Sequence, residues 1–193
     1  MANMYIIAGC NGSGKTTASF TVLPEMLNCR EFVNADSIAA GLSPLQPASV
    51  TIEAGRIMLQ RIKQLLSADV DFAFETTLAT RSYVPLIKEA HEKGYRVNLL
   101  YFWLASPQFA KQRVQARVKQ GGHNIDEDVI ERRYYRGIKN LLELYMPVVD
   151  EWTVINNMGP FAVTICKGLE KNDKTILNSE LWGIIQQQSK HAN

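Results

Sequence analysis

The chain has 193 residues, of which 46% are hydrophobic and 21% are charged, and its formal net charge is +2. These values are ordinary for one globular domain, and the near-neutral charge gives no support to nucleic acid as a partner. The sequence shows neither a basic leader nor an apolar run long enough to span a bilayer, so we expect no membrane partner and a cytoplasmic location.

A glycine-rich loop follows the first apolar run. Residues 4–8 predict a buried strand, and the next segment, G-C-N-G-S-G-K-T-T, fits the pattern G-x-x-x-x-G-K-[ST]. In this pattern backbone N–H groups surround a phosphate at a helix start, the lysine reaches the β- and γ-phosphates, and the hydroxyl ligates Mg²⁺. Thr16 is therefore the expected Mg²⁺ ligand. The expected nucleotide-binding residues of the loop are Gly9, Asn11, Gly12, Ser13, Gly14, Lys15, Thr16 and Thr17.

Strand and helix patterns alternate along the rest of the chain. Further strands are predicted at 30–36, 71–77, 96–104, 152–155 and 161–165, and helices at 54–66, 85–92, 107–118, 126 toward 147, and 177–187. This alternation is typical of a parallel sheet covered by helices. We therefore predict one α/β domain over residues 1–193 with a P-loop NTPase fold. It should contain a parallel sheet of about five strands, helices on both faces and a helical lid.

Two of the predicted strands end in polar residues at the same edge as the phosphate loop, because the carboxyl ends of parallel strands meet there. Asp36 suits the general base of a kinase, and its alternative role is the N-cap of the next short helix. Three roles stay open for Glu75: holding the acceptor, holding the Mg²⁺ water shell, or pairing with an arginine. Thr76 and Thr77 either bind the acceptor or close the turn. The expected acceptor-binding residues are Asp36, Glu75, Thr76, Thr77 and Arg81.

Arginines cluster on two predicted helices that are joined by Gly121, Gly122 and His123. This arrangement predicts a lid over about residues 113–137 that closes on a triphosphate, with His123 as a polar hinge residue. Guanidinium groups can neutralise charge on a moving phosphoryl group. The expected catalytic cations are Lys15, Arg117, Arg132 and Arg133, and Arg113 is expected to bind nucleotide. The alternative is a solvated face paired with acidic residues, which we favour for Arg136.

The ordered motifs resemble those of the zeta toxin family of small P-loop kinases, particularly its compact bacterial chromosomal members. The resemblance rests on G-C-N-G-S-G-K-T-T, N-A-D-S-I, F-A-F-E-T-T-L and R-V-K-Q-G-G-H-N-I-D-E-D-V-I-E-R-R-Y, in this order. It implies that ATP and Mg²⁺ support phosphorylation of the amino-sugar 3′-hydroxyl of UDP-N-acetylglucosamine, with Asp36 as base and Glu75 helping to hold the acceptor. It also implies an antitoxin protein as a partner, since family antitoxins block the nucleotide site.

Other functions remain open at this point. One is a regulatory ATPase or nucleotide-dependent switch without a dedicated acceptor, and another is a kinase of a different nucleotide-like or antibiotic acceptor. A third is a binding module without catalysis. A GTPase is disfavoured, because no N-K-x-D segment follows a predicted strand.

Overall fold

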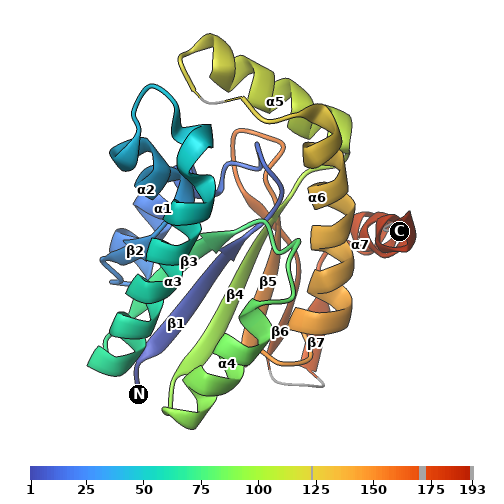
Figure 1. The fold of residues 1–193 in the computed structure, drawn as a ribbon. Helices are drawn as coiled ribbons and strands as arrows, with labels where there is room; N and C mark the ends of the chain where they lie inside the picture. The colour runs from blue at the N-terminus through green and yellow to red at the C-terminus, as the bar shows by residue number, and fades with distance from the viewer. Residues whose placement is uncertain (123, 170–172, 192–193) are drawn as a thin grey trace.

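The computed structural model describes residues 1–122, 124–169 and 173–191. The predicted hinge residue His123, which belongs to the predicted lid, lies outside the described residues. Within the described residues the chain forms a single sheet with helices on its two faces (Figure 1). The prediction of an α/β fold is confirmed.

The sheet has seven strands in the order β2-β3-β1-β4-β5-β6-β7. Their bounds are β1 Asn3–Ala8, β2 Glu31–Val33, β3 Phe72–Thr76, β4 Arg96–Trp103, β5 Glu151–Asn156, β6 Val163–Leu169 and β7 Asp173–Ile176. The strands β1 to β5 pair in parallel, whereas β6 and β7 pair antiparallel at one edge. The predicted count of about five strands was therefore too low. The sequence did not indicate β7 because all four of its residues are exposed, which leaves no alternation of buried and exposed positions.

Seven α-helices connect and cover these strands in the described part of the chain. Their bounds are α1 Lys15–Thr21, α2 Ala35–Leu42, α3 Thr51–Ala68, α4 Tyr83–Glu92, α5 Pro107–Lys119, α6 Glu127–Asn140 and α7 Ser179–Gln188. Short π-helical turns follow α1 at Val22–Met26 and α6 at Leu141–Tyr145, and 3-10 turns lie at Pro47–Val50 and Ser189–His191. None of the described helices combines the length and the apolar character needed to cross a bilayer.

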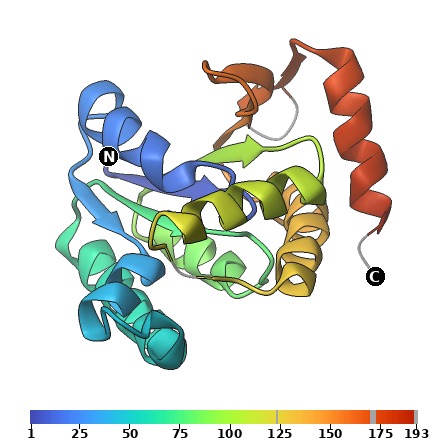
Figure 2. The ribbon, with the colours of Figure 1, turned by 90° about the horizontal axis from the view of Figure 1, so that it is seen from above.

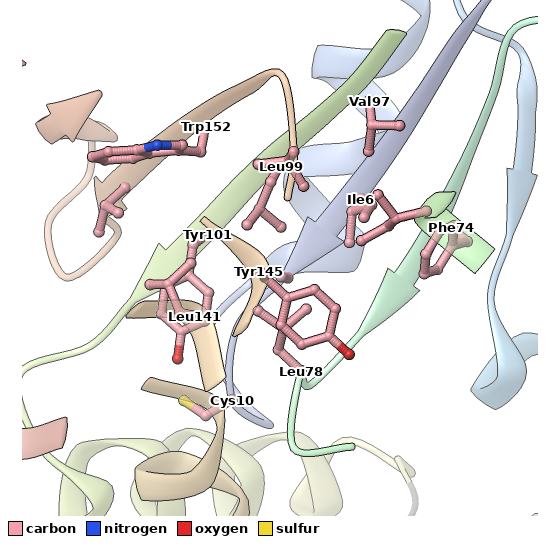
Figure 3. Close-up of a cluster of buried hydrophobic side chains, with 14 of the residues drawn as sticks. Ile6, Cys10, Phe74, Leu78, Val97, Leu99, Tyr101, Leu141, Tyr145 and Trp152 are labelled. Atoms are coloured by element: carbon pink, nitrogen blue, oxygen red, sulfur yellow. The ribbon is translucent and has the colours of Figure 1, made fainter. Parts of the chain in front are cut away.

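The strand residues alternate between two hydrophobic clusters of unequal size. On β1, Met4 and Ile6 face the larger cluster, which includes side chains from α3, α4, α6 and α7. Tyr5 and Ile7 face the smaller cluster beside the helical segment that contains Leu23. Figure 3 shows part of the larger cluster, in which side chains from β1, β3, β4 and the segment after α6 converge. Helices therefore cover both faces, as predicted, but most of the buried apolar surface lies on one side.

Helix α5 crosses the carboxyl ends of the strands, above the loop that follows β1 (Figures 1 and 2). The predicted start of this helix at residue 107 is confirmed. Ser106 is the N-cap, and its hydroxyl accepts a hydrogen bond from the Phe109 backbone N–H. The buried side chains of Ala110 and Val114 join the larger cluster. This packing holds α5 close to the glycine-rich loop, where the candidate site lies.

Candidate active site

The glycine-rich loop between β1 and α1 adopts a conformation that needs its glycines. Gly9, Gly12 and Gly14 all have positive φ, at 141°, 79° and 84°. A Cβ atom on Gly14 would lie 2.5 Å from Nδ2 of Asn157, and one on Gly12 would lie 2.8 Å from the carbonyl oxygen of Ala110. Both the backbone angles and the neighbours therefore exclude larger residues, and the loop leads into the start of α1 as a phosphate-binding loop does.

The Lys15 side chain lies across the inside of this loop and is only 6% exposed. Its ammonium group donates a hydrogen bond of 2.8 Å to the carbonyl oxygen of Cys10 and lies 3.6 Å from Oε1 of Glu75. A buried ammonium group needs such partners, because desolvation of an isolated charge is costly. Burial raises the pKa of the Cys10 thiol to about 11, so this cysteine is a neutral loop residue at physiological pH.

Glu75, at the end of β3, is bound to the phosphate loop and to the end of β2. Its Oε2 accepts hydrogen bonds from the Thr16 hydroxyl at 2.7 Å and from the Asn34 amide at 2.8 Å. The predicted alternative of an arginine partner is wrong, since the cation beside Glu75 is Lys15. The contacts with Lys15 and Thr16 join Glu75 to the phosphate loop, and the contact with Asn34 joins it to the start of α2.

Asp36 occupies the first turn of α2 and is exposed. The N-cap of α2 is Asn34, whose Oδ1 accepts hydrogen bonds from the backbone N–H groups of Asp36 and Ser37. The predicted alternative of Asp36 as an N-cap is therefore wrong. Its carboxylate has no capping role and stays available to a ligand.

One cavity of about 390 Å³ brings together predicted site residues from the phosphate loop, the ends of β2 and β3, and α6. It is lined by Asn11, Lys15, Asn34, Ala35, Asp36, Met58, Glu75, Thr76, Thr77, Ala79, Thr80, Tyr83, Arg132, Arg133 and Arg136. The lining contains four cationic side chains and two carboxylates, which gives a net charge of +2 at neutral pH. A pocket of this size and charge suits a small anionic ligand.

Three arginines of α6 face this cavity. Arg133 is half-buried and donates a hydrogen bond of 3.3 Å to Oδ1 of Asn11 in the phosphate loop. Burial lowers the pKa of the Arg133 guanidinium from its usual value, the Asp36 carboxylate raises it, and Arg132 lowers it. Arg136, predicted to be part of a solvated helix face, lines the cavity as well. Arg132 and Arg136 are both exposed, so the predicted solvent exposure of this face is confirmed, and the same face lines the cavity.

Other predicted residues lie outside the cavity lining. Arg81 and Arg117 are exposed and do not line it, and Thr17 is exposed on α1. Arg113 lies beside the glycine-rich loop, where it donates a hydrogen bond of 3.3 Å to the carbonyl oxygen of Met158. The arginines of α6 therefore line the cavity, whereas those of α5 and Arg81, in the loop before α4, do not.

The loop after β3 also lines the cavity. The Thr76 hydroxyl accepts a hydrogen bond from the Leu78 backbone N–H, so this threonine closes the turn while it also lines the cavity. Leu78 is fully buried with a φ of 60°, a strained value for a residue with a Cβ. Asn140 and Tyr145 donate hydrogen bonds to the carbonyl oxygens of Leu78 and Thr80, which hold this loop against α6 and the turn after it.

Asn157 belongs to the phosphate site and was not found from the sequence. Its amide donates a hydrogen bond of 2.6 Å to the carbonyl oxygen of Ser13, and it follows β5 directly. Residue 157 lies between two strands predicted from the sequence, 152–155 and 161–165, and no role was predicted for it. The signal was a polar residue at the carboxyl end of a parallel strand, the same signal that identified Asp36 and Glu75.

The donor groups fit a nucleotide phosphate and Mg²⁺. Within the described residues, the Ser13 hydroxyl is completely buried in the loop and has no hydrogen-bond partner. The oxygens of Thr16 and Glu75 lie 2.7 Å apart, and hard oxygen donors are what Mg²⁺ prefers. No group of three or more His, Cys, Asp or Glu side chains suited to a metal ion occurs among the described residues.

Comparisons with solved structures support the fold. The structure of the AvrRxo1-ORF1:-ORF2 complex with ATP aligns with this chain at a TM-score of 0.72 and 15% identity. The alignment covers 96% of this chain and 63% of that one. The PezAT chromosomal toxin-antitoxin system of Streptococcus pneumoniae aligns with a TM-score of 0.68 at 15% identity, over all of this chain and 87% of that one. Shikimate kinase from Acinetobacter baumannii aligns with a TM-score of 0.52 at 20% identity, over 82% of this chain and 86% of that one. At these identities the likeness establishes the fold, that of P-loop kinases.

Sequence comparisons establish the family. An uncharacterized protein of Haemophilus influenzae is 34% identical over 127 residues, which cover 65% of this chain and 88% of that protein. The family model described as zeta toxin matches residues 2–163, most of the chain. The resemblance inferred from the ordered motifs is thereby confirmed, and the chain belongs to the zeta toxin family.

Proposed function

We propose that this protein is a kinase that transfers the γ-phosphoryl group of ATP to a hydroxyl group of a nucleotide sugar such as UDP-N-acetylglucosamine. The observation that carries the proposal is the shared cavity. Lys15 of the phosphate loop and the exposed carboxylate of Asp36 line it together, and three arginines of α6 add positive charge to the same cavity. The Asp36 carboxylate belongs to a helix separate from the phosphate loop, where it can accept a proton from the hydroxyl of an acceptor bound beside ATP.

Each residue has a role in this reaction. Asp36 takes the proton from the acceptor hydroxyl as its oxygen attacks the γ-phosphorus, and the bond from that phosphorus to the β,γ-bridging oxygen breaks, leaving ADP. Lys15 and Arg133 lie beside the phosphate loop, where they neutralise charge on the phosphate groups. Arg132 and Arg136 also line the cavity from α6, and they would bind an anionic acceptor there.

Mg²⁺ would be held by the Thr16 hydroxyl, with Glu75 binding its water shell. When bound, it would supply positive charge that neutralises the phosphate groups. The hydrogen bond between Thr16 and Glu75 supports this assignment over a direct role of Glu75 at the acceptor. ATP and Mg²⁺ are thus the proposed co-substrate and cofactor.

A mass-spectrometric screen tests the function directly. The protein is incubated with ATP, Mg²⁺ and, separately, UDP-sugars, nucleosides and antibiotics, and products with one added phosphate are identified. We expect a phosphorylated UDP-sugar. Release of ADP that no acceptor accelerates would instead show a regulatory ATPase, and phosphate on a different compound would correct the acceptor.

The variant Asp36→Asn tests the base. We expect it to lower acceptor phosphorylation by about 100-fold or more, because general-base catalysis contributes roughly 10²–10⁴ in rate, while ATP binding stays nearly unchanged. Asp173→Asn is a matched control, since Asp173 is also an exposed aspartate but lies on β7 at the sheet edge. Phosphorylation at the normal rate by Asp36→Asn would contradict the assignment.

An antitoxin protein is part of the same proposal. The support is membership in the zeta toxin family and the structural likeness to the PezAT toxin-antitoxin system. Expression of this chain alone in bacteria should then arrest growth, and Lys15→Ala should relieve the arrest. Equal growth with and without the active chain would contradict the proposed toxic effect and would not bear on the kinase reaction.

A further inference from the structure

We propose that Asn34 is a positioning residue that couples the proposed base Asp36 to the Mg²⁺ end of the site. The inference rests on the proposed kinase function and adds a residue that the sequence analysis did not assign. Asn34 lies between the end of β2 and the start of α2 and is 6% exposed.

Both ends of the Asn34 amide are used. Oδ1 accepts hydrogen bonds from the backbone N–H groups of Asp36 at 2.8 Å and Ser37 at 3.2 Å. Nδ2 donates a hydrogen bond of 2.8 Å to Oε2 of Glu75, the oxygen that also accepts from Thr16. The opposite orientation of the amide would set NH₂ against two N–H groups and oxygen against a carboxylate, so the contacts admit only one orientation.

This arrangement links two parts of the chain through one side chain. The cap fixes the first turn of α2, and with it the backbone that carries Asp36. The hydrogen bond to Glu75 fixes the carboxylate beside the Thr16 hydroxyl. Partners of this kind orient the groups that bind a metal, and their removal typically costs about 10–100-fold in metal affinity or activity.

Asparagine is required for both tasks at once. Serine at this position keeps an oxygen that can cap α2 but cannot reach Glu75 with a donor. Aspartate keeps the cap and sets a second carboxylate against Glu75, where like charges repel. Alanine removes both contacts. The three substitutions therefore separate the cap from the hydrogen bond to Glu75.

The test compares Asn34→Ser and Asn34→Ala with the normal protein in two assays. The first follows ATP binding by calorimetry across a series of Mg²⁺ concentrations, without acceptor. The second measures kcat and KM for phosphorylation of the acceptor found in the screen. Asn98→Ser is the matched control, because Asn98 is a similarly buried asparagine, 8% exposed, at the opposite end of the sheet.

We expect Asn34→Ser to raise the Mg²⁺ concentration required for tight ATP binding by about tenfold and to lower kcat by about tenfold or more. Its melting temperature should fall no further than that of Asn98→Ser. Asn34→Ala should show the same loss together with a lower melting temperature and faster hydrogen exchange at the Asp36 and Ser37 N–H groups, because the cap is gone.

An unchanged Mg²⁺ dependence of ATP binding in Asn34→Ser would overturn the proposal. So would a loss in Asn34→Ser that the control Asn98→Ser reproduces, since any buried asparagine would then serve equally well. Failure of the kinase function itself has a different signature. In that case the normal protein binds ATP with Mg²⁺ and phosphorylates no acceptor, and the binding assay still decides whether Asn34 positions Glu75.

Discussion

Replacing Glu75 by glutamine should destabilise the nucleotide-free protein, because it removes the only carboxylate within 4 Å of the Lys15 ammonium group among the described residues. The side chains of Lys15 and Glu75 are 6% and 11% exposed, and their charged atoms lie 3.6 Å apart. At an effective dielectric constant of about 20, Coulomb's law gives an attraction of roughly 4–5 kcal/mol at this distance.

The net loss is smaller than this attraction. Glutamine removes the desolvation cost of the carboxylate, and Lys15 keeps its hydrogen bond to the Cys10 carbonyl. We therefore expect a loss of about 3 kcal/mol in the free energy of unfolding, the lower end of what breaking a buried pair costs. For a chain of this length that corresponds to a drop of about 6–12 °C in melting temperature.

Thermal denaturation of Glu75→Gln and the normal protein, without nucleotide, measures this loss. Glu31→Gln serves as the control, since Glu31 pairs with Arg61 at 2.7 Å but both side chains are nearly half exposed. An exposed pair contributes at most about 1 kcal/mol. A melting temperature of Glu75→Gln within 1 °C of normal, a threshold at about the error of the assay, would refute the reasoning.

The same substitution, which should lower stability, should strengthen the binding of metal-free ATP. With Mg²⁺ absent, the Glu75 carboxylate repels the phosphate groups of ATP, so Glu75→Gln should bind metal-free ATP more tightly than the normal protein does. With Mg²⁺ present this advantage should vanish or reverse, because the proposed partner of the metal's water shell is gone. Calorimetric titration in the presence and absence of Mg²⁺ measures the difference.

Three further outcomes follow from the geometry. Arg136→Gln should raise the acceptor KM by about tenfold with little change in the KM for ATP, because Arg136 lines the cavity without contacting the phosphate loop. Steady-state kinetics measure this, and a selective rise in the KM for ATP would reverse the assignment. Gly137→Ala should cost about 1–3 kcal/mol in unfolding free energy, since its Cβ would lie 2.6 Å from the Thr77 carbonyl oxygen, and urea denaturation that shows no loss would contradict this packing. Burial raises the pKa of the Cys10 thiol from about 9 in the unfolded chain to about 11 in the folded protein. The resulting contribution to the free energy of unfolding is complete below about pH 9 and is lost as pH rises through 11. Unfolding free energies measured at about pH 8 and 11 should therefore fall by about 2 kcal/mol more in the normal protein than in Cys10→Ala, and parallel pH dependence would contradict the burial of this thiol.

The parts of the fold with strong local signals could be predicted from the sequence. The phosphate loop was found because its glycines and its lysine occupy fixed positions between an apolar strand and a helix. The central strands β1, β3 and β4 were found because they are largely buried on both faces and read as apolar runs. The edge strand β7 carries no such pattern, since all of its residues face solvent.

The site was predicted less completely, because a side chain's partner depends on packing between distant segments. The sequence located Asp36 and Glu75 at strand ends but did not reveal that Asn34 caps α2 and binds Glu75. Likewise, the sequence identified the α6 arginines as a cluster but did not fix which face of the helix turns toward β3. Gly137, which approaches the Thr77 carbonyl, sets that rotation, and the resulting orientation brings Arg136 to the cavity.

The central claim is that donor and acceptor meet between Lys15 and Asp36 in one cavity. Its most direct test is the mass of a UDP-sugar after incubation with ATP, Mg²⁺ and the normal protein, beside parallel incubations with Asp36→Asn and Lys15→Ala. We expect the UDP-sugar to gain one phosphate with the normal protein and almost none with either variant. Turnover of ATP without a phosphorylated product from any acceptor would contradict it.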